Sequence, residues 1–260
     1  MDALVDSIAT RVLPVLSAWD VVDSVVVLPE GADRYDPGFL VTFDVYHHGR
    51  APEPAERELA FTEREIAEFD SSEDGTIDRA RNDDVPIRIQ YVSIQEFDDY
   101  LQHAVSPQRG PLIGGTYRLY RLLHGRILLN RGAWLDTARR SAGNLSSEFF
   151  SDRSRQLVAR AQRSYEDFAG AVWSGDAMWY QLALGTLLSD ISGALFALNE
   201  RLTPARRAAF RILTELEHLP NEFETRIQYV LGVPEDLGPK KRLEIVGLIL
   251  RDLRQMVLSD

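Results

Sequence analysis

The sequence predicts an α+β protein in which an N-terminal mixed sheet with helices is followed by an α-helical bundle. Up to Gly132 the chain alternates β-branched apolar runs with helical patterns, whereas from Ala133 onward only helical periodicity recurs. The 260 residues suffice for two ordinary domains. The change of pattern therefore predicts an α/β domain over residues 1–132 and an α-helical bundle over residues 133–260.

The first half begins with a predicted helix over residues 3–18, because Leu4, Ile8 and Val12 recur at helical spacing. Apolar or alternating patterns predict strands at 24–28, 39–46, 57–61, 86–92 and 126–129. Capping boxes at Thr62 and Ser93 predict helices that open there, and a further helix is expected over 116–123. The acidic, turn-rich stretch 70–84 is predicted to be a surface loop.

The second half is predicted to be helical throughout, with helices over 133–142, 146–170, 174–199, 203–217, 220–230 and 236–258. The run from Trp179 to Leu198 is rich in leucine, alanine and glycine. Such a composition predicts a central helix that is buried nearly all round.

Composition and charge exclude several classes of function. Zero cysteines exclude disulfides, thiol catalysis and cysteine-ligated metals. The net charge of −11 argues against a protein built around long nucleic acid, which needs clustered lysine and arginine. No apolar run approaches the roughly 18 to 20 residues that cross a bilayer, and the acidic N-terminus has no signal-peptide pattern. We therefore expect a cytoplasmic protein that binds neither a membrane nor long nucleic acid; the oligomeric state stays open.

One stretch carries the strongest functional signal. Two apolar runs, Val25–Leu28 and Phe39–Tyr46, are joined by a loop rich in glycine, proline and aspartate. In an alternating strand, Thr42 and Asp44 share one face, opposite to the apolar side chains of the second run. An acid in the middle of a strand otherwise built to be buried indicates a site.

This layout resembles the nucleotidyltransferase superfamily, in which a strand, a glycine-containing loop and a second strand with an Asp-x-Asp pair form a metal–nucleotide site. Two later segments resemble parts of bacterial nucleotidyltransferase-like proteins. Leu195–Glu200, followed by Thr203-Pro204, is similar to their helical domain, and Tyr120–Asn130 is similar to their linker strand. The resemblance implies a nucleotide or phosphorylated small molecule bound between the two domains with Mg²⁺, and nucleotidyl transfer to a small acceptor.

The resemblance assigns roles to particular residues. Asp44 would be catalytic and, with Asp36 or Asp33, would hold the metal, because paired carboxylates bridge divalent ions to a triphosphate. Glu30 and Gly31 would approach the phosphates. Two arginines, Arg88 on the third strand and Arg121, would neutralise phosphate charge. Thr42 stands where the family has the first acid of its pair, so the active-site motif is degenerate.

Other interpretations stay open at these residues. Asp44 could instead pair with Arg88 across the sheet, which would favour a non-catalytic interaction or regulatory protein that keeps the fold. Asp190, a charge in an apolar helix, could pair with an arginine of a neighbouring helix or contact the acceptor substrate. Arg211 and His218 are seven residues apart and would share a helix face, as in the ribonuclease domains that accompany minimal nucleotidyltransferases.

Overall fold

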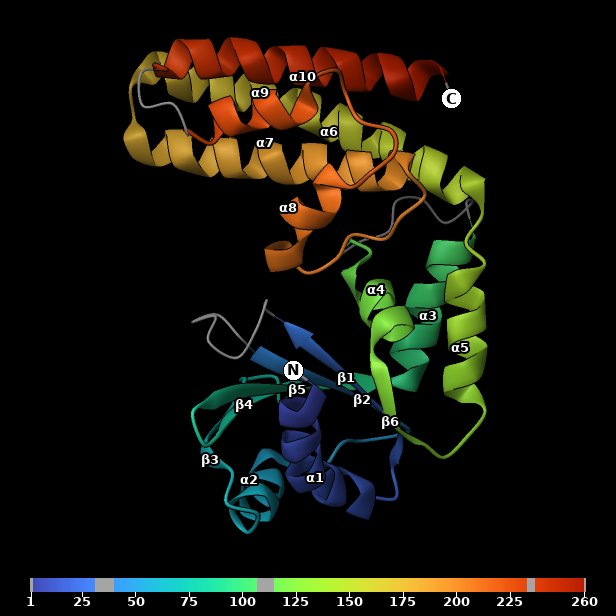
Figure 1. The fold of residues 1–260 in the computed structure, drawn as a ribbon. Helices are drawn as coiled ribbons and strands as arrows, with labels where there is room; N and C mark the ends of the chain where they lie inside the picture. The colour runs from blue at the N-terminus through green and yellow to red at the C-terminus, as the bar shows by residue number, and fades with distance from the viewer. Residues whose placement is uncertain (1, 31–39, 107–114, 233–236, 260) are drawn as a thin grey trace. The chain divides into compact units, whose positions relative to one another are not determined.

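The chain folds into two compact units of different architecture (Figure 1). The structure is a computed structural model that describes residues 2–30, 40–106, 115–232 and 237–259. Among these residues, the first unit contains everything up to Leu145 together with Pro204–Ala208, and the second contains Ser146–Thr203 and the chain from Ala209 onward. The first unit is a sheet with helices and the second is helical, so the predicted α+β class is confirmed.

The first unit is built on a six-stranded mixed sheet. Its strands run in the order β3-β4-β5-β2-β1-β6, with β2 and β5 parallel and every other neighbouring pair antiparallel. The elements, in chain order, are α1 (Asp2–Ala18), β1 (Val22–Glu30), β2 (Leu40–His47), α2 (Pro54–Thr62), β3 (Ala67–Ser71), β4 (Ile77–Asn82), β5 (Val85–Ser93), α3 (Ile94–Val105), α4 (Tyr117–His124), β6 (Arg126–Asn130) and α5 (Trp134–Gly143).

The two faces of this sheet are covered by different helices. One face packs against α1 and α2, where alternate residues of β1, β2 and β5 such as Val25, Phe43 and Ile89 form the apolar core. Figure 1 shows α3, α4 and α5 over the other face. There the buried Tyr46 contacts Phe97 of α3 and Trp134 of α5, with ring centroids 5.4 and 4.8 Å apart. This second face carries the side chains of Thr42 and Asp44.

Three sequence predictions in this unit are wrong. Residues 57–61 form part of α2 rather than a strand, and no helix opens at Thr62, where α2 ends. The predicted loop 70–84 contains most of a hairpin of β3 and β4. Its turn is held by Asp74, whose Oδ1 accepts hydrogen bonds from the Ser72 hydroxyl and from the backbone and hydroxyl of Thr76.

The division into units falls later than the sequence predicted. Helix α5 packs against α3 and α4 and so lies with the sheet, whereas the sequence pattern placed the change of domain after Gly132. Helical spacing predicted α5 itself, but it gave no information on which other helices α5 packs against.

The second unit is a helical bundle around one continuous apolar core. Its helices are α6 (Ser147–Ser174), α7 (Ala177–Leu198), α9 (Phe223–Val230) and α10 (Pro239–Ser259), and α8 (Arg206–Thr214) contributes Leu213 to the same core. Helices α6 and α7 form an antiparallel pair, and α10 lies against α6 and α9 (Figure 1). Caps fix the α6–α7 turn: Gly175 takes a left-handed conformation with φ of 74°, and the Asp176 side chain accepts a hydrogen bond from the Trp179 backbone.

Helix α7 is only half buried, so the prediction of a helix buried nearly all round is wrong. It exposes Met178 and Leu182, at 74% and 62% of their accessible surface. Within the described ranges, α7 is the one helix that is long and apolar enough to cross a membrane by length and composition. Core helices of soluble proteins meet the same criterion, so this is weak evidence for a membrane span.

The proposed pair of Arg211 and His218 does not share a helix face. Helix α8 ends at Thr214, and His218 lies in the following turn. The backbone of His218 exchanges hydrogen bonds with the side chain of Asn199 at 2.8 and 2.9 Å. The ribonuclease interpretation therefore loses the geometry on which it depended.

Candidate functional site

The candidate site lies on the face of the sheet that α4 covers. Asp44 is in the middle of β2, directly beside Val26 of β1 and Gln90 of β5 in the strand register. Thr42, two residues earlier on the same face, is in register with Arg88. Thr42 and Asp44 are 1% and 4% exposed, so this polar row is almost entirely removed from water.

Arg121 of α4 reaches Asp44 across this face. Its Nη2 lies 3.0 Å from Asp44 Oδ1, and both side chains are about 95% buried. The same Nη2 donates a 2.5 Å hydrogen bond to Gln90 Oε1, so Arg121 holds Asp44 by charge and Gln90 by an aligned hydrogen bond. One of the interpretations left open by the sequence paired Asp44 with Arg88; the cation that the structure shows beside Asp44 is Arg121. Gln90 was not expected as a partner.

The sequence places Arg121 inward because α4 is amphipathic. Leu119 and Leu122, on either side of Arg121, are fully buried. The helix ends at Gly125, whose backbone N–H donates to the Arg121 carbonyl at 2.9 Å. A side chain at Gly125 would lie 3.0 Å from Val26 Cγ1, so this glycine lets the end of α4 approach β1 closely.

Arginines outnumber carboxylates around the buried Tyr46. Burial raises the pKa of the Tyr46 hydroxyl well above its ordinary value, and the charge of Asp44 raises it further. Three arginines oppose this shift, in the order Arg121, Arg118 and Arg139. Among the described residues, the largest charge effects on this hydroxyl therefore come from one carboxylate and three guanidinium groups.

Two of these arginines have neutral groups among their partners. The guanidinium of Arg118 lies over the rings of Phe97 and Tyr100, at 5.4 and 5.0 Å from their centroids. Arg139 donates to the Gly125 carbonyl, and burial lowers its pKa from the ordinary value. The ring and carbonyl contacts orient these guanidinium groups without neutralising their charge, and the Asp136 carboxylate also acts on Arg139.

The described residues do not fit a two-metal centre. None of them form a group of three or more histidine, aspartate or glutamate side chains that could hold a metal ion. The carboxylate of Asp44 is already paired with a guanidinium. Thr42 offers only a hydroxyl, whereas Mg²⁺ is usually bound through carboxylates.

Several residues expected at the site fall outside the described part of the chain. These are Gly31, Asp33 and Asp36. Glu30 is described only through its backbone, which ends β1 opposite Leu40 of β2. The metal role of Asp36 with Asp44 and the phosphate role of the Glu30–Gly31 loop stay predictions.

Asp190 is bound entirely within the helical unit. Its Oδ1 accepts a hydrogen bond from Nε of Arg160 at 2.6 Å and forms an ion pair with Nη2 of the same guanidinium, also at 2.6 Å, and its Oδ2 accepts from the Ser164 hydroxyl at 2.8 Å. Asp190 is 2% exposed, whereas the Arg160 side chain is 55% exposed. These contacts match the interpretation that a neighbouring helix supplies an arginine; the role in acceptor binding stays a prediction.

Comparisons with known proteins leave the family open. No protein-family model matches the chain, and no curated protein matches it significantly. Among solved structures, the chain is similar to a nucleotidyltransferase-like protein from Exiguobacterium sibiricum 255-15, with 10% identity and a TM-score of 0.48. The similarity covers 96% of this chain and 73% of the other. At this level it transfers neither a residue role nor an activity.

Proposed function

We propose that this chain is a nucleotidyltransferase-like protein that binds a nucleotide or another phosphorylated small molecule through arginines, without nucleotidyl transfer. The observation that supports it is the set of charges around Tyr46: the largest charge effects there come from three arginines and from the carboxylate of Asp44. The binding site would lie on the polar sheet face beneath α4.

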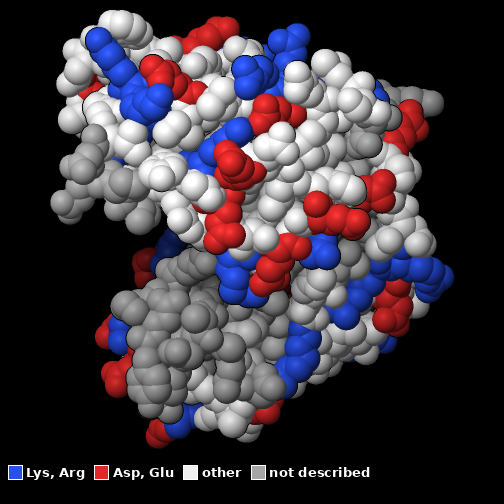
Figure 2. Space-filling view, turned by 45° about the horizontal axis from the view of Figure 1, so that its top comes forward, with Lys and Arg blue, Asp and Glu red and all other residues white. Residues whose placement is uncertain are grey.

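The charge balance favours an anionic ligand. Asp44 pairs with the buried Arg121, whereas Arg118 and Arg139 are only partly buried and could contact an anion from outside. Figure 2 shows acidic and basic side chains interspersed on the surface turned toward the viewer, and the whole chain carries a net charge of −11. The arginine excess is therefore local, and guanidinium groups suit phosphate oxygens because they donate two parallel hydrogen bonds.

The residues at the acid-pair positions of β2 argue against nucleotidyl transfer. Metal-assisted nucleotidyl transfer needs carboxylates that hold the ions on both the attacking and the leaving oxygen. At the two positions of the acid pair this chain has Thr42 and Asp44, and Arg121 lies 3.0 Å from the remaining carboxylate. The proposal includes a cytoplasmic location, where nucleotides and other phosphorylated small molecules are present, and it needs no Mg²⁺.

Calorimetric titration with ATP, GTP, CTP and UTP, each in Mg²⁺ and in EDTA, tests the proposal. We expect saturable binding that persists in EDTA. Arg118→Gln should weaken it by about 10-fold or more, because a hydrogen bond to a charged group contributes about 1.5–3 kcal/mol. Arg155→Gln, an exposed arginine of the helical unit that pairs with Asp152, is the matched control and should change nothing.

Asp44→Asn separates the arginine site from a metal site. The amide keeps an acceptor for Arg121 but removes the negative charge, so an arginine site should bind the nucleotide as tightly as before, or more tightly. A metal site built on Asp44 would lose binding. Binding that requires Mg²⁺ and disappears in Asp44→Asn would contradict the proposal and restore the metal interpretation.

A second candidate is a non-catalytic interaction or regulatory protein that keeps the fold and binds no nucleotide. The buried ion pair of Arg121 with Asp44 favours it, because this pair occupies the groups that a ligand would otherwise contact. Absence of heat with all four nucleotides, from protein shown to be folded by its cooperative thermal unfolding, would support this candidate and rule out the first.

A further inference from the structure

Helix α4 carries a row of three aromatic side chains along one side. Tyr117, Tyr120 and His124 follow one another at intervals of three and four residues, which places them above one another on the helix. The ring centroids of Tyr117 and Tyr120 are 6.3 Å apart, and those of Tyr120 and His124 are 4.3 Å apart. Both tyrosines are partly exposed and His124 is exposed, so this aromatic row ends in an imidazole that solvent reaches.

Arginines of the proposed binding site lie at both ends of the aromatic row. The Cζ atom of Arg121 is 5.1 Å from the centroid of the Tyr117 ring. At the other end, Arg139 donates a hydrogen bond to the carbonyl of Gly125, the residue that directly follows His124. Arg121 is buried, whereas Arg139 is only partly buried. The end of the row at His124 therefore offers an exposed ring and an accessible guanidinium side by side.

The His124 imidazole is uncharged at neutral pH. Its partial burial lowers its pKa below the ordinary value of 6.5, and the charge of Arg139 lowers it further. The imidazole therefore presents a flat aromatic face beside Arg139 and does not add a second cation. Tyr120 supports this face from behind, because its ring packs against the imidazole.

The ring and the guanidinium match the two parts of a nucleotide. Guanidinium groups suit phosphate oxygens, to which they donate parallel hydrogen bonds. Every nucleobase has a π-face that stacks on an exposed aromatic side chain. A sugar phosphate without an aromatic ring would use the arginine alone.

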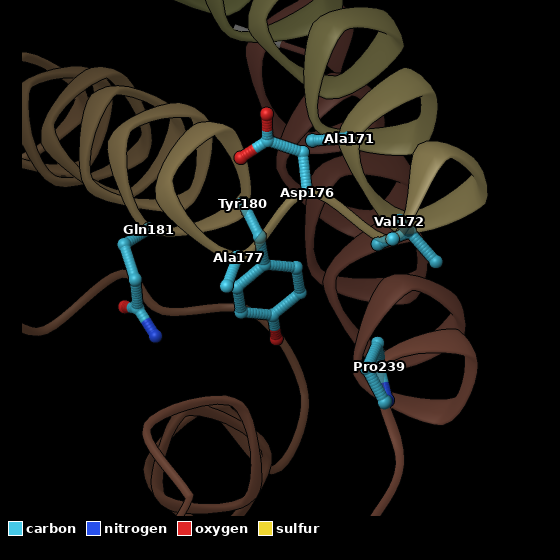
Figure 3. Close-up of a pocket in the computed structure, with 8 residues that line it drawn as sticks. Ala171, Val172, Asp176, Ala177, Tyr180, Gln181 and Pro239 are labelled. Atoms are coloured by element: carbon cyan, nitrogen blue, oxygen red, sulfur yellow. The ribbon is translucent and has the colours of Figure 1, made fainter.

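A pocket in the helical unit lacks this combination of groups. It has a volume of about 190 Å³ and lies at the α6–α7 turn, and Figure 3 shows the apolar Ala171, Val172 and Pro239 in its lining. None of the described residues that line it is basic, and the carboxylate of Asp176 would repel a phosphate. The aromatic row of α4 is therefore the better place for a phosphorylated ligand.

We propose that His124 is the base-stacking residue of the arginine site, with the phosphates of the nucleotide directed toward Arg139. The site then prefers a purine nucleotide, which has the larger base, to a pyrimidine nucleotide, and it binds phosphates without a ring most weakly. This inference rests on the proposed function and narrows it. His124 sets specificity and takes part in no chemical step.

Calorimetric titration of the full chain in EDTA with ATP, UTP and inorganic tripolyphosphate tests the role of His124. All three have a chain of three phosphates, and only the nucleotides have a base. We expect ATP to bind at least about fivefold more tightly than tripolyphosphate, which is the lower end of what base stacking contributes, with UTP between them.

Two variants at His124 separate stacking from packing. His124→Leu removes the ring, so the affinities of ATP and UTP should fall to that of tripolyphosphate, which should itself not change. His124→Phe keeps a ring and should keep the preference for ATP. The matched control is His218→Leu at an exposed histidine of the helical unit, and it should leave all three affinities unchanged.

The outcomes distinguish a failure of base stacking from a failure of the proposed function. Equal affinities of wild-type protein for ATP and tripolyphosphate would overturn the stacking role, while the arginine site would stand. A preference for ATP that survives in His124→Leu would also overturn it, as would a parallel loss of tripolyphosphate binding in that variant. If none of the three compounds bound to folded protein, the proposed function would fail, and the stacking role with it.

Discussion

Arg57 and Asp78 form an ion pair inside the sheet unit, with Arg57 Nη2 3.1 Å from Asp78 Oδ1 and side chains only 1% and 0% exposed. Arg57 also lies 4.2 Å from the centroid of the Tyr91 ring and donates to the Gly75 carbonyl at 2.9 Å. Burial raises the pKa of the Asp78 carboxyl, although Arg57 and a Ser71 hydrogen bond act to lower it. The pair therefore links α2 to the β3–β4 hairpin without being strongly stabilising in itself.

Removing one member of this pair should be costly. We expect Arg57→Ala to lower the free energy of unfolding by about 3–5 kcal/mol, because Asp78 would be left as an unpaired buried charge. Replacing both together, with Arg57→Met and Asp78→Leu, should recover much of that loss. Urea unfolding checks both effects, with Arg50→Ala as control, since the exposed Arg50–Glu53 pair should contribute about 0–1 kcal/mol. A double variant no more stable than Arg57→Ala would contradict this account.

Asp190 should matter for stability rather than for ligand binding. Asp190→Asn weakens two charge-assisted hydrogen bonds, from Arg160 and Ser164, and removes the ion pair with Arg160, so we expect a loss of about 1–3 kcal/mol. Chemical denaturation gives this value, and Asp152→Asn on the exposed Arg155 pair serves as the matched change. If Asp190→Asn instead left stability intact and abolished binding of a small acceptor, the acceptor interpretation would stand.

His47 should make the protein less stable in acid. It is buried at the end of β2, its Nδ1 lies 3.1 Å from the Gly49 carbonyl oxygen, and burial lowers its pKa from the ordinary value of 6.5. A histidine with a lowered folded pKa contributes stability above its unfolded pKa, and this is lost as the pH falls through the folded pKa. Thermal midpoints from about pH 8 to about pH 5 should therefore fall less in His47→Gln than in wild type.

Removing an exposed histidine controls for general effects of acid on the fold. His218→Gln changes an exposed side chain in the helical unit, and its pH profile should follow that of the wild type. If the thermal midpoints of His47→Gln and of the wild type fell equally with pH, protonation of the buried imidazole would not be a cause of the acid instability.

Replacing either of two glycines at helix ends by alanine should change the stability of the protein, in opposite directions for the two sites. A Cβ at Gly125 would lie 2.8 Å from the Arg121 carbonyl oxygen, so Gly125→Ala should destabilise the protein by about 1–3 kcal/mol. A Cβ at Gly143 would meet nothing within 4 Å, and Gly143→Ala should stabilise the end of α5 by about 0.4–1 kcal/mol. Urea midpoints of the two variants should move in opposite directions; a shared direction would contradict the packing at Gly125.

The sequence identified most helices and four of the six strands, because in these segments the spacing of apolar residues matches the spacing of the buried residues. It failed at the β3–β4 hairpin, where the inward face of β4 carries Asp78, Ala80 and Asn82. Two of these three buried residues are polar, so the alternation that marks a strand is hidden. The sequence did contain a signal for α2 that the strand prediction for residues 57–61 overlooked. Pro54 begins the helix, and proline is favoured at the first position of a helix.

The candidate site was only partly visible in the sequence. Asp44 could be recognised because an acid interrupts an apolar strand, and Arg121 was named for phosphate rather than for Asp44. Their pairing joins β2 to a helix far along the chain, and local spacing carries no information on such contacts.

The ion pair of Asp44 with Arg121 also bears on how such a sequence can change over generations. Thr42→Asp alone would restore the acid pair of the resembled family, but Arg121 would still neutralise it. Loss of Arg121 alone would leave the carboxylate of Asp44, which is 4% exposed, without the guanidinium that lies beside it. Selection on stability alone would therefore act against loss of the arginine.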